Sequence, residues 1–208
     1  MRLAIAFTAA MLPSIAHAGV DWARGVVTAD GLGVADRHAP SPATARGTSR
    51  RVAEDAAKLE LARAISTLPI AGGGTIGKRA DDPAVKQRLD AAVAHAYSVA
   101  AEPETDGAWR VTMAVPIEAL RQAIDGPREL AATGDTGASV IVVDGAGAAK
   151  PAIGYTVGGV HGATIFVTDV PAWASAAPHV TASKISQAAI DAPATGATPA
   201  TLFVIVAK

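Results

Sequence analysis

The chain has 208 residues, of which 50% are hydrophobic and only 4% aromatic, so one large domain or two small ones would need aliphatic cores. The formal net charge of −1 argues against a nucleic-acid-binding protein, because such proteins normally present a strongly basic face. The sequence contains no cysteine, so we expect neither disulfides nor the acylated cysteine of a lipid anchor.

The first eighteen residues have the pattern of a secretory signal peptide. Arg2 supplies a positive charge, residues 3–12 form an apolar run too short to span a bilayer, and Ala16-His-Ala18 is typical of a cleavage site. We expect cleavage between Ala18 and Gly19. The mature protein should then be periplasmic, and the alternatives are association with the outer membrane or secretion from the cell. A buried N-terminal helix is the competing interpretation. No later stretch reaches transmembrane length.

Residues 20–34 predict a strand or one arm of a hairpin, because Val26 and Val27 are β-branched. Within this segment, Gly31 and Gly33 indicate either a β-bulge or the close approach of another backbone.

A long helix is predicted over residues 43–68, with Ser41 or Thr44 as its N-cap. Two apolar stripes recur at spacings of three and four, and they consist of Val52, Ala56 and Leu59 and of Leu61, Ile65 and Leu68. Small residues beside them, at Ala53, Ala57 and Ala64, would permit close approach to a sheet. The charged residues of this helix are assigned to a solvated face.

Residues 71–78 contain Gly72 and Gly77-Lys78 at the spacing of a phosphate-binding loop. That motif needs a Ser or Thr after the lysine to hold magnesium, but Arg79 stands there. The motif should also follow a strand, whereas this segment follows a predicted helix. We therefore favour a flexible linker.

The middle of the chain predicts a helix, a hairpin and a second helix. Asp81, Asp82 and Pro83 are typical of a helix start, here for residues 83–95. The hairpin strands are predicted at 97–101 and 108–115, and the second helix at 116–124. The second hairpin strand shows period-two alternation of apolar residues, at Trp109, Val111, Met113 and Val115.

The last third of the chain reads as short strands separated by loops. Residues 139–143 and 202–206 are continuous apolar runs, which indicate buried strands, and shorter strands are predicted at 152–157 and 164–167. We expect an α+β fold with small antiparallel sheets and helices packed on one face. The predicted organisation is a signal peptide at 1–18, an N-terminal α+β domain at 19–126 and a C-terminal β-rich subdomain at 127–208.

No convincing chemical site is visible in the sequence. The five histidines, at 17, 38, 95, 161 and 179, are not at metal-ligand spacing, and no Gly-x-Ser-x-Gly segment occurs. Gly145 and Gly147 suggest a dinucleotide fingerprint, but Lys150 stands where the third glycine belongs. The carboxylate pairs, Asp81 with Asp82 and Asp135 with Asp144, are better explained as loop and cap residues. We predict no catalytic, cofactor-binding or metal-binding residue, no cofactor and no enzyme activity.

Three stretches resemble one family of exported bacterial proteins. They are Val20-Asp-Trp-Ala-Arg-Gly-Val-Val-Thr-Ala-Asp-Gly-Leu-Gly33, Ala45-Arg-Gly-Thr-Ser-Arg-Arg-Val-Ala-Glu-Asp-Ala56 and Ser139-Val-Ile-Val-Val-Asp-Gly-Ala-Gly-Ala-Ala-Lys-Pro-Ala152. With the closing strand at 202–206, they make most of residues 20–206 similar to the LPP20 lipoprotein and FlgT (flagellar assembly T) family.

The resemblance implies a non-enzymatic cell-envelope protein with small α+β domains, associated with the outer membrane or the flagellum. It transfers no catalytic residues. The chain differs from the lipoprotein members by lacking the acylated cysteine, and we expect it to lack the further C-terminal domain of the flagellar members. Membrane anchorage and a flagellar role therefore stay open.

The leading hypothesis is a non-catalytic periplasmic structural or protein-interaction protein whose partners are envelope proteins. The alternative is a periplasmic small-molecule or glycan-binding module that uses the Gly-rich segments 72–77 or 145–162. An enzyme with an unfamiliar site ranks third, since it requires titratable residues that converge in a pocket.

Overall fold

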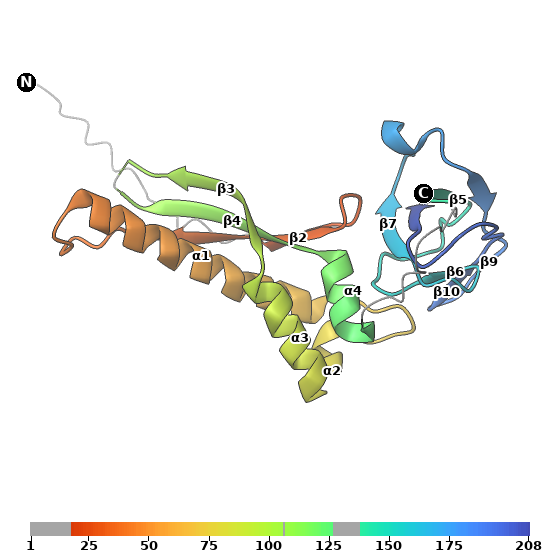
Figure 1. Cartoon of the computed structure of the whole chain (residues 1–208), viewed down its shortest axis with the longest axis horizontal. Helices are drawn as coiled ribbons and strands as arrows, with labels where there is room; N and C mark the ends of the chain where they lie inside the picture. The colour runs from red at the N-terminus through yellow and green to blue at the C-terminus, as the bar shows by residue number, and fades with distance from the viewer. Residues whose placement is uncertain (1–17, 106, 127–137) are drawn as a thin grey trace, which may run out of the picture.

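The computed structural model describes residues 18–105, 107–126 and 138–208. Figure 1 shows a first unit, in which a long helix lies along a sheet, and a second unit built mainly of short strands. The expected α+β class with small sheets is confirmed. The predicted signal peptide, apart from Ala18, and the first residues of the predicted second subdomain lie outside the described residues. Those two assignments stay predictions.

The first sheet is antiparallel and has the strand order β1-β2-β4-β3. Its strands are β1 (Ala18–Asp21), β2 (Val26–Gly33), β3 (Tyr97–Pro103) and β4 (Trp109–Pro116). The predicted hairpin is confirmed as β3 and β4, and the segment 20–34 forms most of a second hairpin, β1 and β2. The alternation in β4 reports the face that α1 covers, since Val111, Met113 and Val115 are buried in the core of this unit.

Helix α1 (Pro42–Thr67) covers one face of the first sheet and lies closest to β2. Its limits match the predicted helix to within one residue. Ser41 is the N-cap, because its hydroxyl oxygen accepts a hydrogen bond of 3.2 Å from the backbone N–H of Thr44. The helix ends before Leu68 and Pro69, as proline cannot continue the hydrogen-bonding pattern.

The buried stripe of α1 differs from the predicted one. Its buried residues are spaced by four and are Ser49, Ala53, Ala57, Leu61 and Ile65. Val52 and Leu59, which we expected on the buried face, are 47% and 55% exposed. The predicted placement of these two residues is wrong, because the prediction assumed that large aliphatic side chains and not small ones would face the sheet.

Close packing of backbone on backbone explains why small residues face the sheet. A Cβ atom on Gly31 would lie 1.9 Å from the carbonyl oxygen of Ala53, and one on Gly33 would lie 1.7 Å from that of Ser49. The β2–β4 register runs through both glycines without a shift. Of the two explanations offered for these glycines, the close approach is confirmed and the bulge is not.

Three shorter helices complete the first unit, namely α2 (Ile76–Arg79), α3 (Pro83–Ala94) and α4 (Ile117–Asp125). α3 and α4 correspond to predicted helices, whereas α2 was not predicted. Asp82 caps α3 by accepting a 2.8 Å hydrogen bond from the N–H of Ala84, which confirms its assignment as a cap residue. The Arg88 Nε atom donates to the carbonyl of Ala123 at 2.7 Å and joins α3 to α4. Across the described ranges, no helix combines the length and apolar character needed to cross a membrane.

The second four-stranded sheet is an exception to the antiparallel expectation, because all its strands are parallel. Its order is β7-β11-β5-β8, from β5 (Val140–Asp144), β7 (Ala163–Val167), β8 (His179–Thr181) and β11 (Leu202–Val206). The apolar runs predicted as buried strands are confirmed as β5 and β11. They are continuous rather than alternating because both faces of the sheet are covered, as is usual for parallel sheets.

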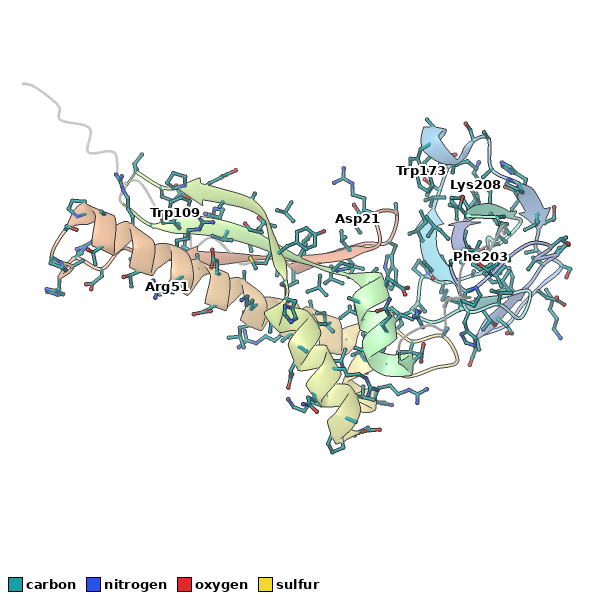
Figure 2. The ribbon with its side chains drawn as sticks, in the orientation of Figure 1. Asp21, Arg51, Trp109, Trp173, Phe203 and Lys208 are labelled. Atoms are coloured by element: carbon teal, nitrogen blue, oxygen red, sulfur yellow. The ribbon has the colours of Figure 1, made fainter. Side chains whose placement is uncertain are left out.

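Loops and short elements cover the two faces of this parallel sheet. Ile141 and Phe203 pack on one face beneath a three-stranded sheet made of β6 (Thr156–Val157), β9 (Lys184–Ile185) and β10 (Ala189–Asp191). Val142 and Val204 pack on the other face, near the short 3-10 helix η1 (Ala172–Ala174). Figure 2 shows Phe203 inside the second unit and Trp173, which is 60% exposed, at its edge.

The two units meet at the β1–β2 turn and at Ile153. The carbonyl of Trp22 accepts a 3.1 Å hydrogen bond from the N–H of Phe166, and the two rings meet edge-on at 6.0 Å. Ile153 belongs to the second unit by sequence, but its side chain is buried in the core of the first. The two units are thus joined by backbone hydrogen bonds and by a shared apolar contact.

Candidate ligand-binding groove

A groove lies where three segments distant in sequence come together, namely 69–73, 148–155 and 185–187. We refer to it as the loop groove. Backbone hydrogen bonds hold the segments in place, from Ala71 N–H to the Ile153 carbonyl (2.8 Å), from Ile153 N–H to the Pro69 carbonyl (3.0 Å) and from Gly72 N–H to the Gln187 carbonyl (2.7 Å). The two Gly-rich regions considered for ligand binding are therefore brought together in space.

The first wall of the loop groove is the turn that follows α1. Pro69 pairs with Thr75 in an antiparallel bridge, and Gly72, Gly73 and Gly74 between them have φ values of +89°, +108° and +85°. Side chains other than hydrogen rarely tolerate this region, so the three glycines permit the tight turn. The segment is a hydrogen-bonded turn attached to the second unit, and its interpretation as a flexible linker is wrong.

The second wall is the segment that follows β5. A Cβ atom on Gly147 would lie 2.5 Å from the carbonyl oxygen of Lys208, so the chain passes close to the C-terminal residue at this point. Lys150 and Pro151 then line the groove, and Gly154, with φ of +91°, turns the chain toward Tyr155 and β6. The segment after β5 has no α-helix, which a dinucleotide fingerprint would require.

The cavity has a volume of about 690 Å³, within the range of ordinary small-molecule sites. Its lining is largely apolar, with a few polar side chains. The lining residues are Pro69, Ile70, Gly73, Ala148, Lys150, Pro151, Ala152, Tyr155, Ile185, Ser186 and Gln187. Lys150 is the one charged residue in this described lining, and none of these residues is acidic.

Tyr155 is the buried aromatic residue of the groove lining. Its residue surface is 5% exposed, and its ring packs edge-on against Phe166 with centroids 5.7 Å apart. Within the described ranges its hydroxyl has no protein hydrogen-bond partner, and the oxygen is not among the fully buried polar atoms, so it stays accessible to water or to a ligand. Burial raises the pKa of the Tyr155 phenol, so at neutral pH it stays an uncharged donor and acceptor.

The other polar side chains divide into structural and available groups. The Ser186 hydroxyl donates to the Ala189 carbonyl at 3.1 Å and accepts from the Ala189 N–H at 3.0 Å, so it holds the β9–β10 turn. Lys150 is exposed and Gln187 is exposed, and neither side chain is engaged elsewhere in the described part of the chain. An incoming ligand can therefore meet an ammonium group, an amide and a phenol.

The remaining residues noted in the sequence do not join the loop groove. Lys78 and Arg79 lie in α2, which follows a bridge and a turn rather than a long strand. Asp135 lies outside the described residues. Ala18 and Gly19, at the predicted cleavage point, pair with Ala29 and Thr28 in the β1–β2 hairpin.

Sequence reasoning missed a contact between Asp144 and His179. The His179 Nδ1 and the Asp144 Oδ2 lie 2.7 Å apart, and both side chains are nearly half exposed. Asp144 ends β5 and His179 begins β8. These two strands are parallel neighbours in the sheet but lie far apart in the sequence. The expected role of Asp144 as a loop or cap residue therefore does not describe it, because its side chain links β8 to β5.

Among the described residues, the buried side-chain polar atom without a hydrogen-bond partner is the Nε1 of Trp109. The Arg50 guanidinium lies 5.4 Å from the centre of the Trp109 ring. Figure 2 shows Trp109 at the end of the first unit that is farther from the second. It therefore belongs to the packing of α1 on β4 and not to the loop groove.

The described residues include no group of three or more His, Asp or Glu that could hold a metal ion.

Comparison with known proteins finds no relative: no protein-family model matches the chain, and a search of curated proteins finds no match.

Proposed function

We propose that this protein is a non-catalytic binding protein whose loop groove takes a small molecule. The observation that carries the proposal is the composition of this groove, whose lining is largely apolar and includes Tyr155, a residue whose hydroxyl has no protein hydrogen-bond partner within the described ranges. Cavities of this composition are typical of small-molecule sites. A ligand that bonds the Tyr155 phenol gains a hydrogen bond that the apolar walls help to shield from water.

The proposal also places the protein in the periplasm, where a bound molecule would come from the cell envelope or the medium. The signal-peptide pattern of residues 1–18 supports this location. The resemblance to LPP20 and FlgT proteins supports a non-enzymatic role, because it implies no catalytic residues.

A thermal-shift screen of the purified protein against small polar metabolites and sugars tests the proposal. A ligand that binds the folded state must raise the unfolding midpoint in a concentration-dependent manner. The matched variant is Tyr155→Phe, which removes only the hydroxyl. We expect a ligand that stabilises the wild type and has a weaker effect on this variant. A screen with no hit, or hits that act equally on both proteins, would contradict the proposal.

A structural or protein-interaction role is a second candidate, and the exposed edge of the first sheet favours it. β3 is an edge strand, and its Tyr97 and Val99 side chains are 48% and 58% exposed. We propose as occupant an extended strand of an envelope protein, which would pair with β3 by backbone hydrogen bonds.

Crosslinking and mass spectrometry of envelope fractions from the native host test this second role. We expect reproducible crosslinks that join residues near β3 to one envelope protein. A Val99→Lys variant, which places a charge on the edge strand, should lose them. Crosslinks that persist in this variant would show that another surface makes the contact.

A further inference from the structure

We propose that the natural ligand of the loop groove is a small monoanionic molecule with an apolar body, of the carboxylic-acid class. The inference rests on the proposed binding function and specifies its chemistry. It comes from the charge, the polar groups and the walls of the groove.

The charge of the groove favours an anion. Lys150 is its one charged lining residue, and no ion pair occupies its ammonium group within the described residues. A lysine ammonium is a compact point charge that pairs with a carboxylate or a phosphate. A cationic ligand would face this charge with no acidic residue of the described lining to balance it.

The number of charges favours a carboxylate over a phosphate ester. One lysine balances one negative charge, whereas a phosphate monoester carries about 1.5 to 2 negative charges at neutral pH. The uncharged phenol of Tyr155 offers one hydrogen bond, and a carboxylate oxygen can accept it. A phosphate would keep a partly uncompensated charge beside apolar walls, which is costly.

The walls of the groove favour an apolar body. Ile70, Pro151 and Ile185 line the cavity from the three different segments, together with Pro69 and Ala152. Contact with these side chains would remove apolar ligand surface from water, worth roughly 25 cal/mol per Å². A short aliphatic or aromatic carboxylic acid satisfies the charge, the phenol and the walls together, whereas a free sugar would leave the walls without a matching surface.

Isothermal titration calorimetry with three probes of equal chain length tests the inference: octanoate, the neutral octanamide and octyl phosphate. We expect octanoate to bind the wild type most tightly and octanamide about tenfold more weakly, because the amide lacks the charge that meets Lys150. Octyl phosphate should not exceed octanoate. Octanoate affinity should fall as salt concentration rises, since Lys150 is exposed.

Two groove variants and one control locate the binding. Lys150→Gln should lower octanoate affinity about tenfold and remove its preference over octanamide, while Lys150→Arg should retain most of it. Tyr155→Phe should lower the affinity for both probes about fivefold, because both can bond the phenol. Lys58→Gln removes the same charge from α1, outside the groove lining, and should change neither affinity.

The outcomes separate this inference from the proposed function. If octanamide or a sugar binds as tightly as octanoate and the binding depends on Tyr155, the groove is a binding site but its ligand is not an anion. If octyl phosphate binds more tightly and depends on Lys150, the carboxylate assignment is wrong. If no probe binds and the broad thermal-shift screen also finds nothing, both the inference and the proposed function fail.

Discussion

The two four-stranded sheets bury their apolar residues in different ways. The first sheet is covered by α1 on one face, so buried Val27 and partly exposed Thr28 alternate along β2. The second sheet is covered on both faces, so Phe203 and Val204, which point in opposite directions along β11, are both fully buried. A strand therefore shows an alternating or a continuous apolar pattern according to whether one face or both faces of its sheet are covered.

The largest expected effect comes from substitutions along β11 and tests whether both faces of the second sheet are cores. Phe203→Ala should lower the free energy of unfolding by about 4 kcal/mol and Val204→Ala by about 2 kcal/mol, because each leaves a cavity. On β2, Thr28→Ala should change stability by less than about 0.5 kcal/mol. Urea denaturation followed by circular dichroism measures all three. If the Val204→Ala variant were as stable as the Thr28→Ala variant, the second sheet would not have a buried core on both faces.

The next effect concerns the contact of helix backbone on strand backbone in the first unit. Gly31→Ala places a Cβ atom 1.9 Å from the Ala53 carbonyl oxygen and should cost about 3 kcal/mol, because helix and strand must move apart. Gly47→Ala is the matched control, since no atom lies within 4 Å of the new Cβ atom. In the interior of α1 this control should gain about 0.5 to 1 kcal/mol. Equal effects of the two changes in denaturation experiments would disprove the close packing.

A smaller effect is expected at the contact between the units. Ile153→Ala should cost about 2 kcal/mol, because its side chain is buried in the core of the first unit. The loss should also weaken the coupling between units. We expect wild-type unfolding to be one transition by circular dichroism and tryptophan fluorescence, and the variant to show two. A single, merely shifted transition in the variant would mean that the backbone hydrogen bonds suffice to couple the units.

The smallest effect is expected at the Asp144–His179 pair. Asp144→Asn removes the carboxylate from a hydrogen-bonded pair whose side chains are 40% and 45% exposed, so it should cost only about 0.5 kcal/mol. Hydrogen exchange at β8 measures the effect locally, and Val180 and Ala182, whose N–H groups face β5, should lose protection before the rest of the sheet. A loss of several times this size would show that β8 depends on this pair much more than its exposure indicates.

The local features of the first unit were predictable because each has a short-range cause. Ser41 and Asp82 are cap residues beside prolines, and the alternation from Trp109 to Val115 marks one covered face. The side of α1 that meets the sheet was harder to predict. It is chosen by Gly31 and Gly33 on another element, and these glycines favour small partners over Val52 and Leu59.

The second unit and the loop groove depend on contacts between distant residues, and a single sequence does not reveal them. The apolar runs at β5 and β11 fit either strand direction, because no helical crossover separates the strands. The groove requires Ala71 to meet Ile153 and Gly72 to meet Gln187. The sequence pointed to the two Gly-rich segments but not to their meeting. Tyr155 and Gln187 were missed, because a lone aromatic and a lone amide carry no motif.

The glycine contacts between α1 and β2 also have a mechanical consequence. Because the backbones touch at Gly31 and Gly33, α1 and the sheet should move as one rigid body along the length of the helix, which is about 39 Å at 1.5 Å per residue. Pro69 follows the end of α1 and forms a wall of the loop groove that moves with this body. Hydrogen bonds tie Ile153 and Gln187 of the opposite wall to the turn that begins at Pro69, so we expect any widening of the groove to come from residues 148–151.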